Sequence, residues 1–379
     1  MNQNISTCPS IIGAECQKAG AETKTIAVRR NCIIDSIMRG WGRDPRWARS
    51  ELLDYVPDAP ISGRKRNELV TIDRDTFVGP WAGLPVAWSE EDTFDEDTFR
   101  RDVGRCCEAG IPGIYSGGST GEFYAMEFEE FRQVTRIMVE TCHAYDRPAM
   151  VGCTSTYTGG AEMRARWAAE LGADAIQVAL PFWMEVAEEE VVPFFRAVSR
   201  AAGGRPLSIY ETTRAKKALT LAQHQAIKEA VPNYLMVKAN AGTIGTTADG
   251  CEALSSLVNV FVSEHSWAEL GPRGARGCCS AMVYWNPRVV LELWSKLRDG
   301  DWDALRANAQ RLHALGEFLA ANFGVRGFTD TAYDRMGGRA SGFLKTSLRC
   351  RAPYVSATRE DVDRLRQWYE EQYPDMLRL

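Results

Sequence analysis

The sequence predicts an α/β fold, namely a (β/α)8 TIM barrel followed by a C-terminal helical bundle. Short apolar runs, each long enough for one buried strand, recur eight times between residues 83 and 280. Their starts lie about 25 to 36 residues apart, except for a last interval of about 14. The segments between them carry helical stripes, such as Phe99, Val103 and Cys107 at i, i+4 and i+8. Such repeats favour a closed barrel, with a doubly wound open sheet as the alternative.

The predicted strands are short apolar segments bounded by glycine or polar residues. They are Gly83–Trp88, Gly113–Ser116, Ala149–Cys153, Ala175–Ala179, Leu207–Tyr210, Tyr234–Lys238, Val260–Val262 and Gly274–Ser280. In a barrel of this type the active site lies at the carboxyl ends of the strands. The residues that follow these segments are therefore the candidates for chemistry.

The repeats divide the chain into three parts. Residues 1–72 are polar and mixed and form an N-terminal extension, residues 73–284 form the catalytic barrel, and residues 285–379 form a helical region. The extension is either a loosely packed segment, such as one added by an upstream start codon, or an arm that packs on a neighbouring subunit. The predicted helices of the last part are Val289–Leu297, Leu305–Leu319 and Asp361–Tyr373.

The composition is that of a globular protein with a sizeable core, since 45% of its 379 residues are hydrophobic and 25% are charged. A net charge of −5 argues against nucleic acid or an anionic membrane surface as the main partner. No run approaches the roughly 18 apolar residues of a membrane span. The N-terminus has no apolar stretch like that of a signal peptide. We therefore expect a cytoplasmic protein.

Cysteine and histidine patterns predict neither a metal site nor a cofactor. The 11 cysteines include no Cys-x-x-Cys pair, and the four histidines are scattered along the chain. The adjacent pairs Cys106–Cys107 and Cys278–Cys279 lie inside apolar segments. We expect them to be reduced core residues.

One strand ends in a lysine. The apolar run Tyr234–Val237 leads into Lys238, and small residues with Gly242 then open a turn. In one interpretation the run is an edge strand whose ammonium group reaches water. In the other, apolar walls lower the pKa of the amine. A neutral amine is a nucleophile that forms a Schiff base with a carbonyl group.

Two further strand ends carry polar groups. The second strand runs into Gly117-Gly118-Ser119-Thr120-Gly121-Glu122, where glycines allow successive N–H groups to converge on an anion. This pattern suits a small carboxylate or a phosphate, although a plain glycine turn gives the same pattern. The fifth strand ends in Tyr210, whose phenol can donate and accept a proton, although tyrosine in a strand usually serves packing.

These features stand in the order and spacing of a known family. Gly118–Glu122, then Ile209-Tyr210, then Val237-Lys238 resembles the dihydrodipicolinate synthase and N-acetylneuraminate lyase family of class I pyruvate-dependent aldolases. The resemblance covers about residues 77 to 350. It also includes Phe77-Val78-Gly79, Leu171–Ala175, and Gly274–Gly277 leading to Ser280.

The resemblance implies a role for each matching residue. Lys238 would form the imine with the keto carbon of pyruvate or another 2-oxo acid, and Tyr210 would shuttle protons above it. Gly118, Ser119 and Thr120 would hold the substrate carboxylate, and Ser280 would lie near the same site. The family also implies no cofactor or metal, an aldehyde as second substrate, and a homotetramer or homodimer.

The departures from the family bear on the aldehyde. Phe182-Trp183 stand where synthases of this family usually carry a Tyr-Tyr pair, and this segment is locally similar to the hydratase-aldolase branch. We expect both rings near the pocket mouth, favouring an apolar or aryl aldehyde. Arg214 could clamp a second carboxylate, but its register is one residue short, and Glu211 replaces an asparagine. His265 follows the seventh strand and either orients substrate or is structural.

The sequence therefore predicts a Schiff-base-forming class I lyase that joins or splits a carbon–carbon bond between pyruvate and an aldehyde. One alternative is a dehydratase of a sugar-derived 2-oxo acid, in which the same imine acidifies C3 and expels a 4-hydroxyl. Condensation like that of dihydrodipicolinate synthase is a second alternative. A third is a non-catalytic sensor of 2-oxo acids on a barrel scaffold.

Overall fold

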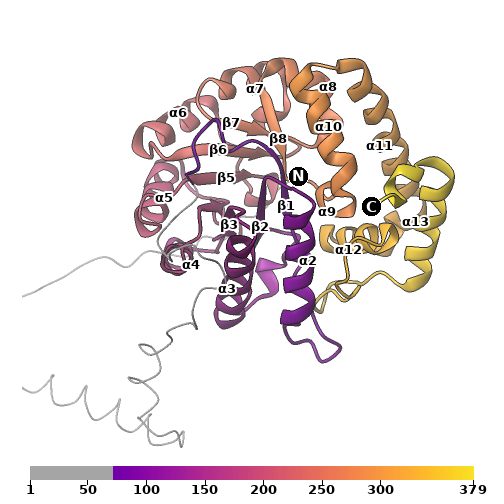
Figure 1. The fold of residues 1–379 in the computed structure, drawn as a ribbon. Helices are drawn as coiled ribbons and strands as arrows, with labels where there is room; N and C mark the ends of the chain where they lie inside the picture. The colour runs from indigo at the N-terminus through magenta and orange to yellow at the C-terminus, as the bar shows by residue number, and fades with distance from the viewer. Residues whose placement is uncertain (1–70) are drawn as a thin grey trace, which may run out of the picture. The chain divides into compact units, whose positions relative to one another are not determined.

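The computed structural model describes residues 71–379, so the predicted extension lies outside the described residues except for its last two positions. Eight parallel strands close into a barrel in chain order (Figure 1). The pairing of the first strand with the eighth, at Gly79↔Gly277, excludes the open sheet. The strands are β1 (Gly79–Gly83), β2 (Gly113–Ser116), β3 (Ala149–Gly152), β4 (Ala175–Val178), β5 (Leu207–Glu211), β6 (Tyr234–Ala239), β7 (Asn259–Phe261) and β8 (Ala275–Cys278).

Helices alternate with the strands and then continue beyond them, which confirms the predicted TIM barrel with C-terminal helices. The barrel helices are α2 (Glu96–Glu108), α3 (Phe128–Ala144), α4 (Thr158–Leu171), α5 (Glu188–Ala201), α6 (Leu221–Ala230), α7 (Ala248–Ser255) and α8 (Trp267–Leu270). The C-terminal helices are α9 (Met282–Trp285), α10 (Pro287–Asp299), α11 (Trp302–Phe323), α12 (Asp330–Ser341) and α13 (Arg359–Gln372). In Figure 1 the C-terminal helices, orange to yellow, gather on one side of the barrel.

The first strand begins earlier than the prediction of Gly83–Trp88. Gly79 and Pro80 have the composition of a turn, yet they pair with β8, and Gly79 adopts φ +79°. Residues 84–88 are buried, but they are not part of the sheet. They follow β1, and the backbone oxygen of Val86 accepts a hydrogen bond from Arg335 of α12.

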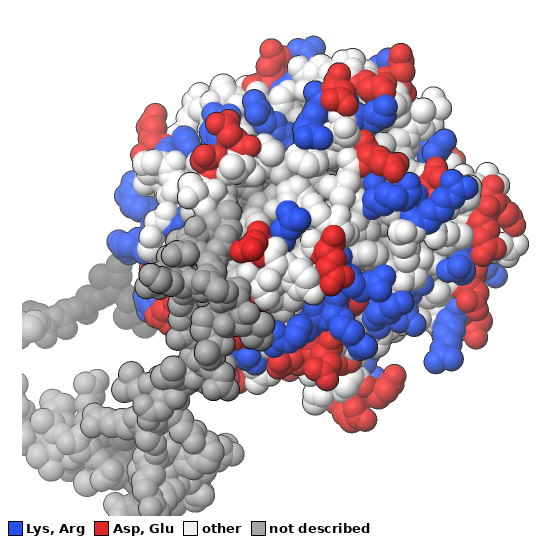
Figure 2. Space-filling model, in the orientation of Figure 1, with Lys and Arg blue, Asp and Glu red and all other residues white. Residues whose placement is uncertain are grey.

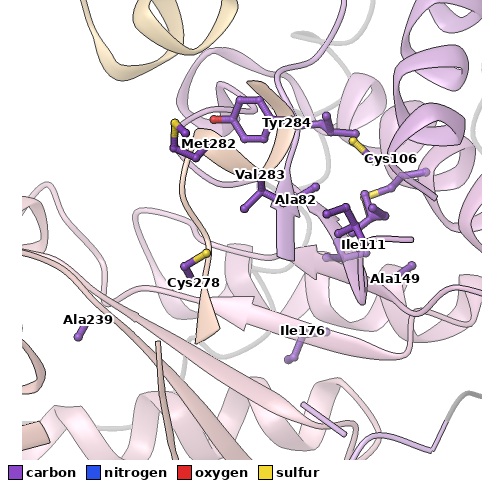
Figure 3. Packing of buried hydrophobic residues seen from close by; sticks show 14 of the residues in the cluster. Ala82, Cys106, Ile111, Ala149, Ile176, Ala239, Cys278, Met282, Val283 and Tyr284 are labelled. Atoms are coloured by element: carbon purple, nitrogen blue, oxygen red, sulfur yellow. The ribbon is translucent and has the colours of Figure 1, made fainter. Parts of the chain in front are cut away.

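Alternate strand residues divide the core into two layers, as the two-residue period of a strand requires. The inner layer fills the barrel with large side chains, including Trp81 of β1 and Phe77, whose rings lie 4.7 Å apart. Gly113 of β2 makes room for Trp81, because a Cβ there would lie 2.5 Å from the indole ring. Figure 3 shows part of the outer layer, with Ala82 of β1 beside Val283 of α9.

The sequence analysis did not predict α12, because its polar and glycine-rich sequence carries no clear apolar stripe. The helix is nevertheless largely buried. Gly337 allows it to approach α9 closely, because a Cβ at this position would lie 2.1 Å from the indole ring of Trp285. Small residues thus replace an apolar stripe as the means of packing.

A buried ion pair ties α12 to the glycine-rich loop after β2. Nη2 of Arg335 lies 2.5 Å from Oε2 of Glu122, and neither side chain is exposed. Glu122 also accepts hydrogen bonds from Nε1 of Trp88 at 2.7 Å and from the backbone N–H of Arg351 at 2.9 Å. Because each carboxylate oxygen is hydrogen-bonded, the charge is compensated inside the protein.

The surface contrasts with this buried pair. Figure 2 shows acidic and basic side chains interspersed over the visible face of residues 71–379. Within the same residues, no helix combines the length and the apolar character that a bilayer span requires.

We predict that Arg335→Met lowers the free energy of unfolding by about 3–5 kcal/mol, because it leaves Glu122 as an uncompensated buried charge. Urea denaturation measures the change. The control is Arg306→Met, which removes an exposed ion pair with Asp303 and should cost about 0.2–1 kcal/mol. Equal costs for the two variants would show that the buried pair contributes no more than a surface pair.

Candidate active site

Lys238 lies near the end of β6, between β5 and β7, so the alternative of an edge strand is excluded. Its register partner on β5 is Tyr210. Nζ of Lys238 lies 4.2 Å from the ring centroid of Tyr210 and donates a hydrogen bond of 3.2 Å to the hydroxyl of Tyr115 on β2. Strands that are distant in sequence thus place two phenols around one amine.

These neighbours reverse the predicted effect on the amine. Burial acts to lower the pKa of Lys238, but the oxygens of Tyr115 and Tyr210 and the thiol of Cys279 outweigh burial and raise the pKa. The expectation of apolar walls was wrong, because the side chains nearest to Nζ are polar. Lys238 therefore rests as an ammonium ion, and it must lose a proton before it can attack a carbonyl.

The loop after β2 presents unpaired amides, and its Thr120 lines the same cavity as Lys238. Gly117 turns the chain at φ +82°, and a short 3₁₀ turn (Phe123–Ala125) follows. Among residues 71–379, the backbone N–H groups of Ser119 and Thr120 have no hydrogen-bond partner. Such amides can bind the carboxylate of a small substrate.

The two hydroxyls of this loop have different partners. Oγ1 of Thr120 donates a hydrogen bond of 2.6 Å to Oδ2 of Asp334 on α12. Oγ of Ser119 accepts a weak hydrogen bond of 3.4 Å from Nη1 of Arg214. The Thr120 proton is thus committed to Asp334, whereas the Ser119 proton remains available to a ligand.

A cavity of about 160 Å³ contains the lysine and most of these polar groups. Its lining includes Thr120, Tyr210, Lys238, Asn240, Ser263, Cys279, Tyr284, Asp330 and Asp334. Nδ2 of Asn240 donates a hydrogen bond of 3.4 Å to the hydroxyl of Tyr210. The cavity is small and polar, which suits the 2-oxo acid part of a substrate.

A second cavity, of about 470 Å³, shares Tyr210 and Asp330 with the first. Its lining is largely aromatic and aliphatic, and includes Phe123, Tyr124, Leu180, Phe182, Phe328 and Tyr354. Phe182 packs edge-on against Phe123, with ring centroids 5.7 Å apart. The shared residues make the two cavities adjacent parts of one site.

Not all of the predicted residues join this site. Phe182 and Arg214 line the larger cavity, but Trp183 does not, and its ring is 72% exposed. His265 is exposed and lines neither cavity. Gly118 and Ser280 also line neither, and the Ser280 hydroxyl lies 3.9 Å from the sulfur of Cys278. Trp183 leaves the cavity because the loop after β4 turns outward, where its carbonyl oxygen accepts a hydrogen bond from Lys216.

Sequence reasoning missed Tyr115, Asp330 and Asp334. Tyr115 is an aromatic residue in a strand, which by itself predicts only packing. The two aspartates lie one turn apart on α12, facing the same site. The only sequence signal was their spacing of four residues, in a segment without a predicted helix.

The substitution of Glu211 for asparagine has a structural explanation. One oxygen of Glu211 accepts the backbone N–H of Leu219 at 2.9 Å, and the other lies 3.3 Å from Nε2 of His224. Nδ1 of His224 in turn lies 2.9 Å from the hydroxyl of Tyr234. This buried network lies behind β5 and β6 and supports both strands of the Tyr210–Lys238 pair.

Comparisons with known proteins identify the family of this chain. The family model of the dihydrodipicolinate synthetase family matches residues 77–372. The chain is 26% identical to the 4-hydroxy-tetrahydrodipicolinate synthase of Methanothrix thermoacetophila over 277 residues, which are 72% of this chain and 91% of that protein. It is 27% identical to the N-acetylneuraminate lyase of Enterobacter sp. (strain 638) over 241 residues, which are 62% and 78% of the two chains.

Solved structures share the fold. YagE, a prophage protein of the dihydrodipicolinic acid synthase family from E. coli K12, solved in complex with pyruvate, superposes with a TM-score of 0.70 at 18% identity. The match covers 78% of this chain and 98% of YagE.

The fold and the matches define the class as that of pyruvate-dependent class I aldolases and lyases. Because the family model covers most of its length, the chain belongs to the dihydrodipicolinate synthetase family. This confirms the resemblance that the sequence motifs indicated. The local similarity to the hydratase-aldolase branch stays a prediction.

Asp334 provides a test of the polar cavity. Burial raises the pKa of Asp334 from its ordinary value of 3.8 to about 7, although hydrogen bonds from Thr120 and Tyr284 act to lower it. Between about pH 4 and pH 7 the folded state therefore holds a proton that the unfolded state has lost. The free energy of unfolding then falls as the pH rises through this window.

We predict that Asp334→Asn removes this fall in the free energy of unfolding with rising pH, because an amide cannot ionise. The stability of the variant relative to the wild type should rise with pH, by up to about 4 kcal/mol between pH 4 and pH 8. Urea denaturation at several pH values measures the difference. A difference that does not vary with pH would contradict the raised pKa.

Proposed function

We propose that this chain is a class I lyase that joins pyruvate to an apolar or aryl aldehyde, or cleaves the corresponding adduct, through an imine on Lys238. One observation carries the proposal. The small polar cavity around Lys238 shares Tyr210 and Asp330 with a larger cavity lined largely by aromatic side chains. The first suits the 2-oxo acid and the second suits its partner.

The 2-oxo acid binds first in this scheme. Its carboxylate accepts hydrogen bonds from the amides of Ser119 and Thr120 and from the Ser119 hydroxyl. This orients the keto carbon toward Nζ of Lys238. After Lys238 releases a proton to solvent water, the neutral amine attacks the keto carbon, and transfer of a proton from the nitrogen to the oxygen of the adduct gives the carbinolamine.

Tyr210 then moves the protons. Its hydroxyl donates a proton to the carbinolamine oxygen, which leaves as water, and the imine forms. The resulting phenolate accepts a proton from C3, which gives the enamine. Asn240 supports this step, because its amide donates a hydrogen bond to the Tyr210 oxygen and stabilises the charge on it.

The enamine carbon next attacks an aldehyde bound in the larger cavity, and the alkoxide takes the proton back from Tyr210. Aromatic faces at Phe182, Phe123 and Tyr354 favour an apolar acceptor through burial and edge-to-face contacts. Water then hydrolyses the imine and frees Lys238. Cleavage follows the same steps in reverse.

The aromatic lining also separates this proposal from its alternatives. A polyhydroxylated acceptor or a sugar acid would place much of its surface against Phe123, Leu180, Phe182 and Phe328, which offer it no hydrogen bonds, although the same lining also carries hydroxyls and the Arg214–Asp330 pair. A non-catalytic sensor has no need of a phenol and an amide arranged around the lysine. Pyruvate-dependent aldol chemistry uses each of these groups.

We predict that Tyr210→Phe slows the exchange of the C3 protons of pyruvate with solvent by about 10²–10⁴-fold, because the proton carrier is lost. NMR in deuterated water follows this half-reaction without any aldehyde. The matched control is Tyr145→Phe, since Tyr145 is an exposed residue directly after α3 that lines neither cavity, and its substitution should leave exchange unchanged. A loss below about threefold at Tyr210 would assign the proton transfer to another group.

We predict that Phe182→Ala lowers kcat/KM for benzaldehyde relative to acetaldehyde by about 10- to 200-fold, because one apolar contact is worth about 1–3 kcal/mol. Steady-state assays with pyruvate and each aldehyde, with products identified by mass spectrometry, measure the ratio. Trp183→Ala is the control, because this neighbouring ring lies outside the cavity. Equal losses for both aldehydes would contradict an acceptor site at Phe182.

A further inference from the structure

An ion pair stands where the two cavities meet. Arg214 belongs to a short 3₁₀ turn (Thr213–Ala215) after β5, and Asp330 is the first residue of α12. Nη1 of Arg214 lies 2.7 Å from Oδ2 of Asp330, and Nη2 lies 2.9 Å from Oδ1. The pair is therefore bidentate, with two parallel hydrogen bonds between planar groups.

The position of this pair gives it contact with a bound substrate. Asp330 lines both cavities, and Arg214 lines the larger one. Nη1 of Arg214 also reaches Oγ of Ser119, beside the amides proposed to hold the substrate carboxylate. Asp330 thus lies in the lining that the two cavities share, next to any substrate that extends from Lys238 into the aromatic cavity.

Although the two side chains are 56% and 48% exposed, the bidentate pairing offsets the positive charge that an arginine would otherwise offer to an incoming anion. Both terminal nitrogens already donate to Asp330, and the pair as a whole is neutral. A second substrate carboxylate would have to displace Asp330, which would then lie unpaired near that carboxylate. Asp334, one helical turn further on, adds negative charge once it ionises.

We propose that Asp330 determines specificity by occupying Arg214, so that the site accepts monocarboxylate 2-oxo acids and uncharged aldehydes and rejects substrates with a second carboxylate. This inference rests on the proposed imine at Lys238 and deepens it by assigning the substrate class. This discrimination is repulsive. A substrate with a second carboxylate would displace Asp330 from Arg214 and would then lie near the unpaired carboxylate of Asp330.

The test uses imine trapping, which needs no turnover. The wild type and Asp330→Asn are titrated with pyruvate, 2-oxoglutarate and 2-oxoadipate in the presence of borohydride, and mass spectrometry measures the adduct on Lys238. In Asp330→Asn, Arg214 becomes free to bind the second carboxylate. The half-saturating concentration of at least one dicarboxylate should fall about tenfold relative to that of pyruvate.

Two further variants establish the cause. Asp303→Asn makes the same change of charge on the exposed face of α11 and should leave every ratio unchanged. Arg214→Gln/Asp330→Asn should lose the gain, because the gain requires the guanidinium group. Thermal unfolding verifies that each variant is folded.

Two results overturn the inference in distinguishable ways. If pyruvate is trapped but the ratios in Asp330→Asn stay within twofold of the wild type, Arg214–Asp330 is only a surface ion pair. If the wild type gives no adduct with pyruvate, the proposed function itself fails, and the inference fails with it.

Discussion

The buried ion pair between Glu122 and Arg335 is the interaction on which the rest of the site depends. It joins the loop after β2 to a helix more than 200 residues further along the chain, as the separation of 213 positions shows. Together with the hydrogen bond from the Thr331 hydroxyl to the carbonyl oxygen of Thr120, it helps to hold Thr120 near Asp334. The cost of burying two charges is offset because Trp88 and the backbone of Arg351 donate to Glu122, while Val86, Thr346 and Ser347 accept from Arg335.

Through this pair the C-terminal helices become part of the candidate active site. The barrel supplies the amine and the phenols from strands, where neighbouring backbones fix their positions, and α12 supplies two carboxyl groups from above. Asp334 engages the Thr120 hydroxyl, and Asp330 engages Arg214. In the loop after β2, the amides of Ser119 and Thr120 and the Ser119 hydroxyl stay available to a carboxylate, and Lys238, whose ammonium group has donors beyond its hydrogen bond to Tyr115, stays available to a carbonyl group.

The fold was predictable because strand and helix periods are local properties of the sequence, and seven of the eight strands matched to within two residues at each end. The helix α12 was not, since Gly337 and Gly338 pack it by close approach and leave no stripe. The order of the motifs in the sequence also predicted that Lys238, Tyr210, Ser119 and Thr120 belong to one site. The direction of the Lys238 pKa shift was wrong, because it depends on Tyr115 and Cys279, which only the closed barrel brings near the amine. Whether Phe182 or Trp183 faces the cavity depended on the path of one loop, which no local pattern specified.

The most direct measurement of the central claim is the site of covalent capture. The protein is incubated with pyruvate and borohydride, digested, and sequenced by tandem mass spectrometry, with Lys238→Ala treated in parallel. The account predicts a reduced adduct on the peptide that contains Lys238, and neither adduct nor turnover in the variant. An adduct on another lysine, or normal turnover by Lys238→Ala, would contradict it.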